Sequence, residues 1–204
     1  DVTIGSVQGT SDISPVSGQT VTVQGVVVGD YEGASPALRG FYMQDAGDSD
    51  TATSDGIFVF EGDNLNRVSV GDVVQVTGVA GENQGQTQLS STTGIELCGS
   101  TSTVTPTDVT LPFASPTAAE QFEGMLVRFP QTLVISEYFN YDRFGEVVLA
   151  LPLDGEPRPF TGTALDEPGG DERADVVSAA VFTTQSVTGI MGQLREKVRS
   201  LPAP

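Results

Sequence analysis

Four aspartates gather in one short polar stretch of the sequence, QDAGDSDTATSDGIFVF, which spans residues 44–60. They are Asp45, Asp48, Asp50 and Asp55. Carboxylates separated by Gly, Ser and Thr are the groups from which proteins build sites for hard cations, with backbone carbonyls as further ligands. The stretch therefore predicts a Ca²⁺ site in the 45–55 loop, with Asp55 closing a ring of ligands begun by the other three.

The same composition also fits a solvated bend between two strands. Asp, Ser, Thr and Gly are the residues that such loops usually contain, because their side chains hydrogen-bond the local backbone. The strict calcium-loop pattern, which ends in a bidentate glutamate, is absent from the stretch. Both interpretations, metal site and solvated bend, stay open on the sequence alone.

A second set of side chains has the chemistry of nucleic-acid binding. Tyr can stack on bases, Arg can contact phosphate, and Asn and Gln amides can hydrogen-bond bases or sugars. Part of the set lies in two polar turns, GENQGQTQ at 81–88 and EYFNYDRFGE at 137–146. The candidates are Tyr31, Arg39, Tyr42, Asn83, Gln84, Gln86, Tyr141 and Arg143. The alternative is that the aromatic residues simply pack.

Side-chain alternation along a strand decides which aromatic residues can face solvent. Phe58 and Phe60 share one face of their segment, whereas Phe41 and Tyr42 point to opposite faces. A phenylalanine pair more often lines a core than a surface. We therefore expect Phe58 and Phe60 inside the protein, and Tyr42 on the surface together with Arg39.

Residues for catalysis are scarce. The sequence has no histidine, which excludes most zinc sites, histidine-activated nucleophiles and the commonest general base. It has no G-x-S-x-G and no phosphate-cradling glycine motif, and nothing selects one carboxylate pair among 27 acids for glycoside hydrolysis. We predict that the chain is not itself an enzyme.

Cys98 is the only cysteine, so an internal disulfide is excluded. Two interpretations stay open. The thiol is buried at the end of a strand, or its partner lies outside this sequence, as an odd cysteine in a secreted protein suggests.

The charge balance is strongly acidic, with 27 Asp and Glu against 9 Lys and Arg, a net charge of −18. Such a surface favours solubility and suits extracellular or saline conditions. It repels phosphate backbones unless the few bases are focused in one place. No stretch approaches the roughly 20 apolar residues of a bilayer-spanning helix, so no membrane span is expected.

The segments that must position these residues have the character of short strands separated by turns. Five strand-like segments occupy 19–31, 39–45, 55–62, 69–82 and 87–99. Five strands with a long first strand and glycine-rich loops are typical of a small Greek-key barrel such as the OB fold. Gly25 lets the first strand coil and serve both sides of the barrel. Residues 1–105 are therefore predicted to form an OB-like barrel.

Residues 106–204 repeat this pattern more weakly. One short helix is predicted at 116–122, with a proline at its first position. Strand-like segments follow at 123–140 and 143–152, and a V-T-G sequence at 185–194 repeats one in the first half. The whole chain is thus predicted to be all-β, with a second, divergent OB-like Greek-key barrel in tandem with the first.

Several sequence segments, taken together, resemble the non-catalytic region of secreted bacterial nucleases. They are IGSVQGTSDISPVSGQTVTVQGVVVGDY, GFYMQD, DTATSDGIFVF, VSVGDVVQVTGVAGENQGQTQL and FEGMLVRFPQTLVISEYFNYDRFGEVVLA, all between residues 4 and 150. The resemblance is to the ExeM/NucH-type extracellular nucleases, in which OB-like β domains precede a catalytic domain of the endonuclease/exonuclease/phosphatase superfamily. The histidines of that catalytic domain are absent here.

The resemblance implies an extracellular location, a nucleic-acid context, a divalent metal in the parent's catalytic domain, and an upstream cysteine as partner for Cys98. We therefore expect a non-catalytic accessory region that binds or positions single- or double-stranded DNA for a downstream nuclease domain. A Ca²⁺ ion in the 45–55 loop would cancel carboxylate charge and bridge to phosphate. The alternative is a structural or interaction module without DNA affinity, which holds the catalytic domain or the cell surface. The net charge favours this alternative.

Overall fold

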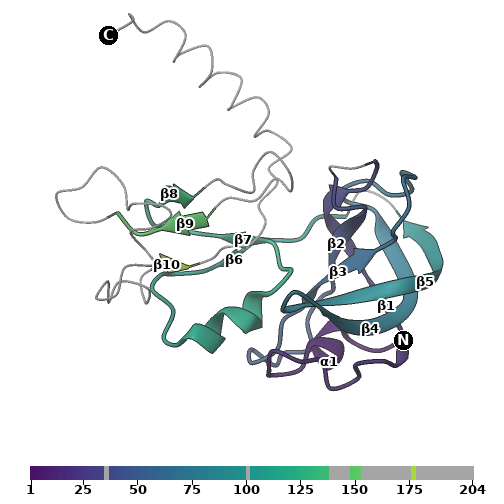
Figure 1. The fold of residues 1–204 in the computed structure, drawn as a ribbon, viewed down its shortest axis with the longest axis horizontal. Coiled ribbons are helices and arrows are strands. Elements are labelled where there is room, and N and C mark those ends of the chain that lie inside the picture. Colours follow the sequence, from purple (N-terminus) through teal and green to yellow (C-terminus); the bar gives the residue numbers. More distant parts are fainter. Residues whose placement is uncertain (35–36, 100–101, 138–147, 153–175, 178–204) are drawn as a thin grey trace, which may run out of the picture.

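Strands dominate the regular structure of a computed structural model, which describes residues 1–34, 37–99, 102–137, 148–152 and 176–177. Ten strands and two short helices lie within these residues (Figure 1). The described residues are therefore mostly β, as predicted. No helix among the described residues is long and apolar enough to cross a membrane.

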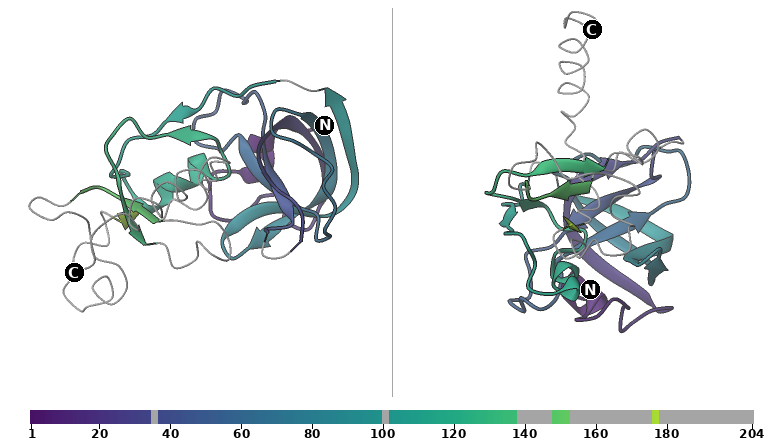
Figure 2. Two further views of the ribbon diagram at one scale, coloured as in Figure 1. Left: turned by 90° about the horizontal axis from the view of Figure 1, so that it is seen from above. Right: turned by 60° about the vertical axis from the view of Figure 1, so that its left-hand side comes forward.

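The first five strands form a closed barrel, in the order β1-β2-β3-β5-β4 (Figure 2). They are β1 (Thr20–Tyr31), β2 (Gly40–Gln44), β3 (Gly56–Phe60), β4 (Val73–Asn83) and β5 (Gln86–Gly99). Each falls on a segment predicted from the sequence. All neighbours pair antiparallel except β3 and β5, which pair parallel.

The long strand β1 closes the barrel because it pairs on both sides. Its first half pairs with β4 from Thr20 to Val26, and its second half pairs with β2 from Val26 to Tyr31. Gly25 lies where the partner changes. A Cβ atom there would stand 2.7 Å from the carbonyl oxygen of Gln44, so the predicted role of this glycine in coiling the strand is consistent with its packing.

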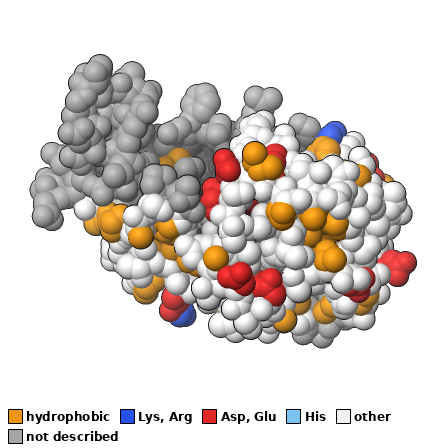
Figure 3. Space-filling model, turned by 90° about the horizontal axis from the view of Figure 1, so that it is seen from below, with side chains coloured by type: hydrophobic (Ala, Val, Ile, Leu, Met, Phe, Trp, Pro, Cys, Tyr) orange, Lys and Arg blue, Asp and Glu red, His pale blue; other side chains and the backbone are white. Residues whose placement is uncertain are grey.

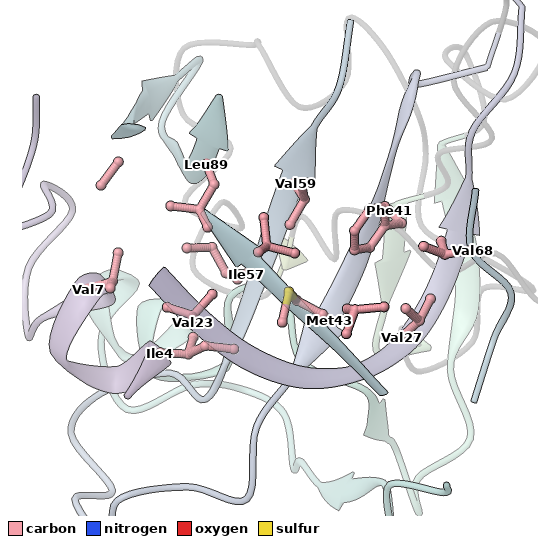
Figure 4. Packing of buried hydrophobic residues seen from close by; sticks show 13 residues of the cluster. Ile4, Val7, Val23, Val27, Phe41, Met43, Ile57, Val59, Val68 and Leu89 are labelled. Atoms are coloured by element: carbon pink, nitrogen blue, oxygen red, sulfur yellow. The ribbon is translucent and has the colours of Figure 1, made fainter. Parts of the chain in front are cut away.

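The barrel core is filled mainly by Val and Ile, with Phe41 and Met43 from β2 (Figure 4). On β3 it is Ile57 and Val59 that point inward, each with no exposed surface. Phe58 therefore points to the outside of the barrel, and so does Phe60, because side chains alternate along a strand. The expectation that this phenylalanine pair lines the barrel interior was wrong, although Phe58 is buried on the outer face.

A short helix that the sequence pattern did not indicate packs against the barrel core. Helix α1 (Ile4–Gln8) places Ile4 and Val7 among the fully buried core residues (Figure 4). Thr3 caps its start by accepting the amide of Ser6, and Gly9 follows its last residue with φ 74°. Five residues are too few to display a 3.6-residue period.

The described part of the second half contains two small sheets. Strands β6 (Thr107–Asp108) and β7 (Val127–Arg128) pair parallel, and β8 (Val134–Glu137), β9 (Val148–Ala150) and β10 (Val176–Val177) form an antiparallel sheet in the order β10-β9-β8. The predicted helix is present as the 3₁₀ helix η1 (Pro116–Phe122). The second barrel is not confirmed, since most of the residues predicted to form it lie outside the described ranges. The boundary at residue 105 stays a prediction.

The second half packs against the barrel through residues 123–126, which we call the strap. Ser54 donates to the carbonyl oxygen of Glu123, and the amide of Leu126 donates to the Gln44 side chain at 2.9 Å. Gly56 and Gly124 approach so closely that a Cβ on Gly56 would overlap the carbonyl of Gly124. The strap therefore lies directly on the outside of β2 and β3, on the side of the barrel that faces the small sheets (Figure 1).

Candidate functional site

The carboxylate of Asp45 is used to build the fold. One of its oxygens accepts the backbone amide of Ile4 at 2.7 Å, and the other accepts that of Gly47 at 2.9 Å. Ile4 is the first residue of α1, so the charge of Asp45 lies at the positive end of that helix. Asp45 thus ties the 45–55 loop to the helix and to the barrel end.

Asp48 and Asp50 form two successive turns with their own backbone. Asp48 accepts the amide of Asp50, and Asp50 accepts that of Ala52, both at 2.9 Å. Both aspartates are exposed. An aspartate that bonds the amide two residues ahead is the ordinary side-chain turn of polar loops.

Asp55 is the one aspartate of this loop with a buried, unsatisfied oxygen. Its Oδ1 atom is buried and has no hydrogen-bond partner among the described residues. Burial raises the pKa of Asp55 above its ordinary value, and the carboxylates of Asp45 and Asp48 raise it further. Within the described ranges, no three Asp, Glu, Cys or His side chains gather as a metal site. The geometry favours the solvated bend, and the Ca²⁺ site stays a prediction.

Replacing Asp45 with alanine is expected to lower the free energy of unfolding by about 1–2 kcal/mol, because the amides of Ile4 and Gly47 lose their charged acceptor. Urea titrations followed by circular dichroism measure it. Asp50→Ala is the matched control, because this exposed turn residue should cost less than about 0.5 kcal/mol. A Ca²⁺-dependent rise in stability that Asp50→Ala removes would instead establish the metal site and contradict the bend.

Three aromatic residues form a row on the outside of β1, β2 and β3. The rings of Tyr31 and Tyr42 meet edge to face at 5.7 Å, and Tyr42 packs on Phe58 at 4.7 Å. Tyr42 is only 6% exposed and Phe58 only 5%. Tyr42 therefore points outward from the barrel, as expected, but it is buried there. It cannot offer a free ring face, whereas Tyr31 is half-buried at the end of the row.

Arg39 lies beside this aromatic row, with its guanidinium carbon 5.3 Å from the centre of the Phe60 ring. Its backbone has φ 60°, in the left-handed region that residues other than glycine rarely adopt. The conformation is held by its carbonyl, which accepts the amides of Glu61 and Gly62. Both Arg39 and Phe60 are half-buried. Sequence reasoning missed Phe60 as a site residue because it assigned that ring to the core.

Arg39 differs from the other basic residues that the structure describes. Arg67 forms ion pairs with Glu61 and Asp63, both at 2.7 Å, and Arg128 pairs with Asp108 at 2.6 Å. No ion pair to Arg39 occurs among the described residues. Its guanidinium is therefore the positive charge best placed in this region to meet an anionic ligand.

The amide residues of the β4–β5 turn have divided roles. Asn83 and Gln84 are exposed at the tip, where Gln84 and Gly85 form a two-residue turn with φ 56° and 81°. Gln86 instead donates its side-chain amide to the hydroxyl of Tyr42 at 2.7 Å, which fixes that ring. The remaining two candidates, Tyr141 and Arg143, lie outside the described residues.

A cleft of about 810 Å³ lies elsewhere on the barrel and was not foreseen from the sequence. Its walls are the outside of β1 near Gln24, the aspartates Asp45 and Asp55, and the connecting residues 102–105. No Lys or Arg lines it, so it does not suit a phosphate group.

A buried acidic pair was also missed. The side chain of Glu61 is 2% exposed, and Glu32 is buried beside it and accepts the amides of Arg67 and Val68 at 2.9 Å. Burial raises the pKa of Glu61 to about 7, and the neighbouring Glu32 adds to this. The pair holds the 61–68 loop against the end of β1, and no sequence pattern pointed to it.

Cys98 is exposed near the end of β5, so the interpretation as a buried thiol was wrong. A partner outside this sequence stays a prediction. No protein-family model, curated protein or solved structure matches this chain. The resemblance to secreted nucleases therefore remains an expectation, and the function must be argued from the barrel and its outer face.

Proposed function

We propose that this chain is a non-catalytic accessory module of a secreted nuclease, and that the outer face of its first barrel binds single-stranded nucleic acid weakly. The observation that carries the proposal is the Arg39 guanidinium lying over Phe60, 5.3 Å from the centre of the ring. Aromatic rings and guanidinium groups are the side chains that contact the bases and phosphates of single strands.

The barrel topology supports this assignment. Its strand order, parallel β3–β5 pair and long first strand agree with an OB fold. OB folds bind oligonucleotides and oligosaccharides on strands 2 and 3 and on the loops 1–2 and 4–5. Here Arg39 ends the loop between β1 and β2, and Asn83 and Gln84 form the turn between β4 and β5. A second, divergent OB-like barrel in residues 106–204 belongs to the same proposal.

The charges limit how strong this binding can be. With one unpaired guanidinium in this region and a net charge of −18, the protein should neutralise about one phosphate. The logarithm of the association constant should then fall with the logarithm of salt concentration with a slope of about −0.7, the value for one phosphate on a single strand. Ca²⁺ in the 45–55 loop would lessen the repulsion.

Arg39→Ala is expected to weaken binding of a fluorescent oligothymidylate about tenfold at low salt and to abolish the salt slope, because it removes the contacting cation. Fluorescence anisotropy measures both quantities. Arg128→Ala is the matched control: it removes the same charge, but from the exposed ion pair with Asp108 in the β6–β7 sheet. Equal loss in the two variants, or no binding by the wild type with or without Ca²⁺, would contradict the proposal.

A second candidate function is a scaffold without DNA affinity, which holds the catalytic domain or the cell surface. The strap favours it, because this segment lies against β2 and β3 and covers part of the face that a nucleic acid would use. The surface charge favours it too, since acidic side chains outnumber basic ones on the face in Figure 3. Co-elution with the catalytic domain, together with absent DNA binding, would support the scaffold.

A further inference from the structure

The strap carries a partly buried carboxyl group, that of Glu123, into the contact between the second half and the barrel. Both oxygens of Glu123 lie 3.2 Å from the backbone amide of Thr87 on β5, which donates to them. Its main-chain carbonyl accepts the hydroxyl of Ser54, a fully buried residue. Glu123 is thus held at its backbone and at its side chain by two different parts of the barrel.

The charged groups around Glu123 are all acidic among the described residues. Glu82 from β4 shares Thr87 with it, because one Glu82 oxygen accepts the Thr87 hydroxyl at 3.0 Å. The other Glu82 oxygen is buried and has no partner among these residues. Glu120 from η1 also acts on Glu123, and Asp12 from the loop after α1 acts on Glu120. No basic side chain compensates this group within the described ranges.

We propose that the strap is a pH-operated latch, closed on the barrel while the Glu123 carboxyl is protonated and released when that group ionises. Closure needs Glu123 beside Glu82 and Glu120, and an added negative charge there is both desolvated and repelled. Release would free the side chains of Gln44 and Ser54. It would also uncover the part of the outer face of β2 and β3 on which the strap lies. The latch goes beyond the proposed function and does not depend on DNA binding.

The ionisation of Glu123 determines in which direction a change of pH moves the strap. Burial raises the pKa of Glu123 from 4.5 to about 7; Glu120 and Glu82 raise it further, and the Thr87 amide opposes them. At a pH between 4.5 and about 7, Glu123 keeps its proton when the strap is closed and loses it when the strap is open. Rising pH therefore favours opening. The latch is fully closed below the lower value and loosest above the upper one.

Amide hydrogen exchange measured by NMR tests the latch directly. The Leu126 amide donates to Gln44 and the Thr87 amide to Glu123, so both should lose protection when the strap opens. Corrected for intrinsic rates, their protection should fall about 100-fold from pH 5 to pH 8, since each pH unit in this window changes the closing equilibrium by up to tenfold. Core amides of β2 report whether the barrel itself stays folded.

Three variants make the outcome decisive. Glu123→Gln keeps an oxygen for the Thr87 amide but cannot ionise, so its protection should not change with pH. Glu82→Gln removes one neighbouring charge and should move the midpoint to lower pH, which tests the proposal even if Glu123→Gln folds poorly. Glu96→Gln, at an exposed position on β5, is the matched control and should follow the wild type. A wild type without pH dependence, or a Glu123→Gln protein that retains it, would overturn the latch.

Discussion

Replacing Phe41 with alanine is expected to lower the free energy of unfolding by about 3–5 kcal/mol, the usual range for deleting a buried aromatic side chain. Phe41 has no exposed surface and points into the barrel from β2 (Figure 4). Its neighbours in the core come from strands whose positions barrel closure fixes, so they cannot collapse into the space that the ring leaves. The loss should therefore lie well above that of surface substitutions.

Urea unfolding followed by circular dichroism measures this loss, and Phe60→Ala is the matched control. Phe60 is the same residue type on the next strand, but it is half-buried on the outside of the barrel beneath Arg39. Its replacement should cost less than about half as much as that of Phe41, because less apolar surface is re-exposed. Equal costs for the two variants would mean that the inward and outward faces of β3 are assigned the wrong way round.

The strands of the barrel could be predicted from the sequence, but not which face of each strand points into the barrel. Alternation divides β3 into two sets of side chains without saying which set lies inside. Ile57 and Val59 form one set, and Phe58 and Phe60 form the other. A choice by size alone puts the phenylalanines in the core. The closed barrel takes the β-branched set inside. The aromatic set lies outside, where Phe58 packs on Tyr42 and Phe60 lies under Arg39.

The candidate residues were found from the sequence, whereas their partners were not. Asp45 bonds the amide of Ile4, 41 residues away, and Gln86 bonds the hydroxyl of Tyr42, 44 residues away. Such pairs exist only once the strands have closed, so composition and spacing within one loop do not reveal them. For that reason the sequence marks the aspartates as ligands, although in the folded chain Asp45 accepts the amide of the first residue of α1.

The strap had no sequence signal because it depends on two glycines 68 residues apart. Gly56 on β3 and Gly124 in the strap touch through their backbones, and Gly124 has φ 69°. A side chain on either residue would separate the two halves of this contact. Each glycine on its own looks like an ordinary strand end or turn, so only the folded chain shows that they form a pair.

Gly56→Ala is expected to lower the free energy of unfolding by about 3 kcal/mol, at the upper end of the usual cost of overpacking. The added methyl group would overlap the Gly124 carbonyl and the amide nitrogen of Met125. Both are backbone atoms, so no flexible side chain can yield. The strap must therefore lift from β3 or displace it. Urea unfolding measures the loss of stability. In a separate hydrogen-exchange measurement, the Leu126 amide should be unprotected already at low pH.

Gly81→Ala provides the opposite expectation in the same barrel. No atom lies within 4 Å of the Cβ position at Gly81, on β4, and its backbone is not in the left-handed region. Alanine there should raise stability by about 0.4–1 kcal/mol, because it reduces the freedom of the unfolded chain. Two Gly→Ala changes in one barrel, on β3 and on β4, should thus act with opposite signs. If Gly56→Ala also left stability unchanged or raised it, the strap would not lie on β3, and the latch at Glu123 would lose its structural basis.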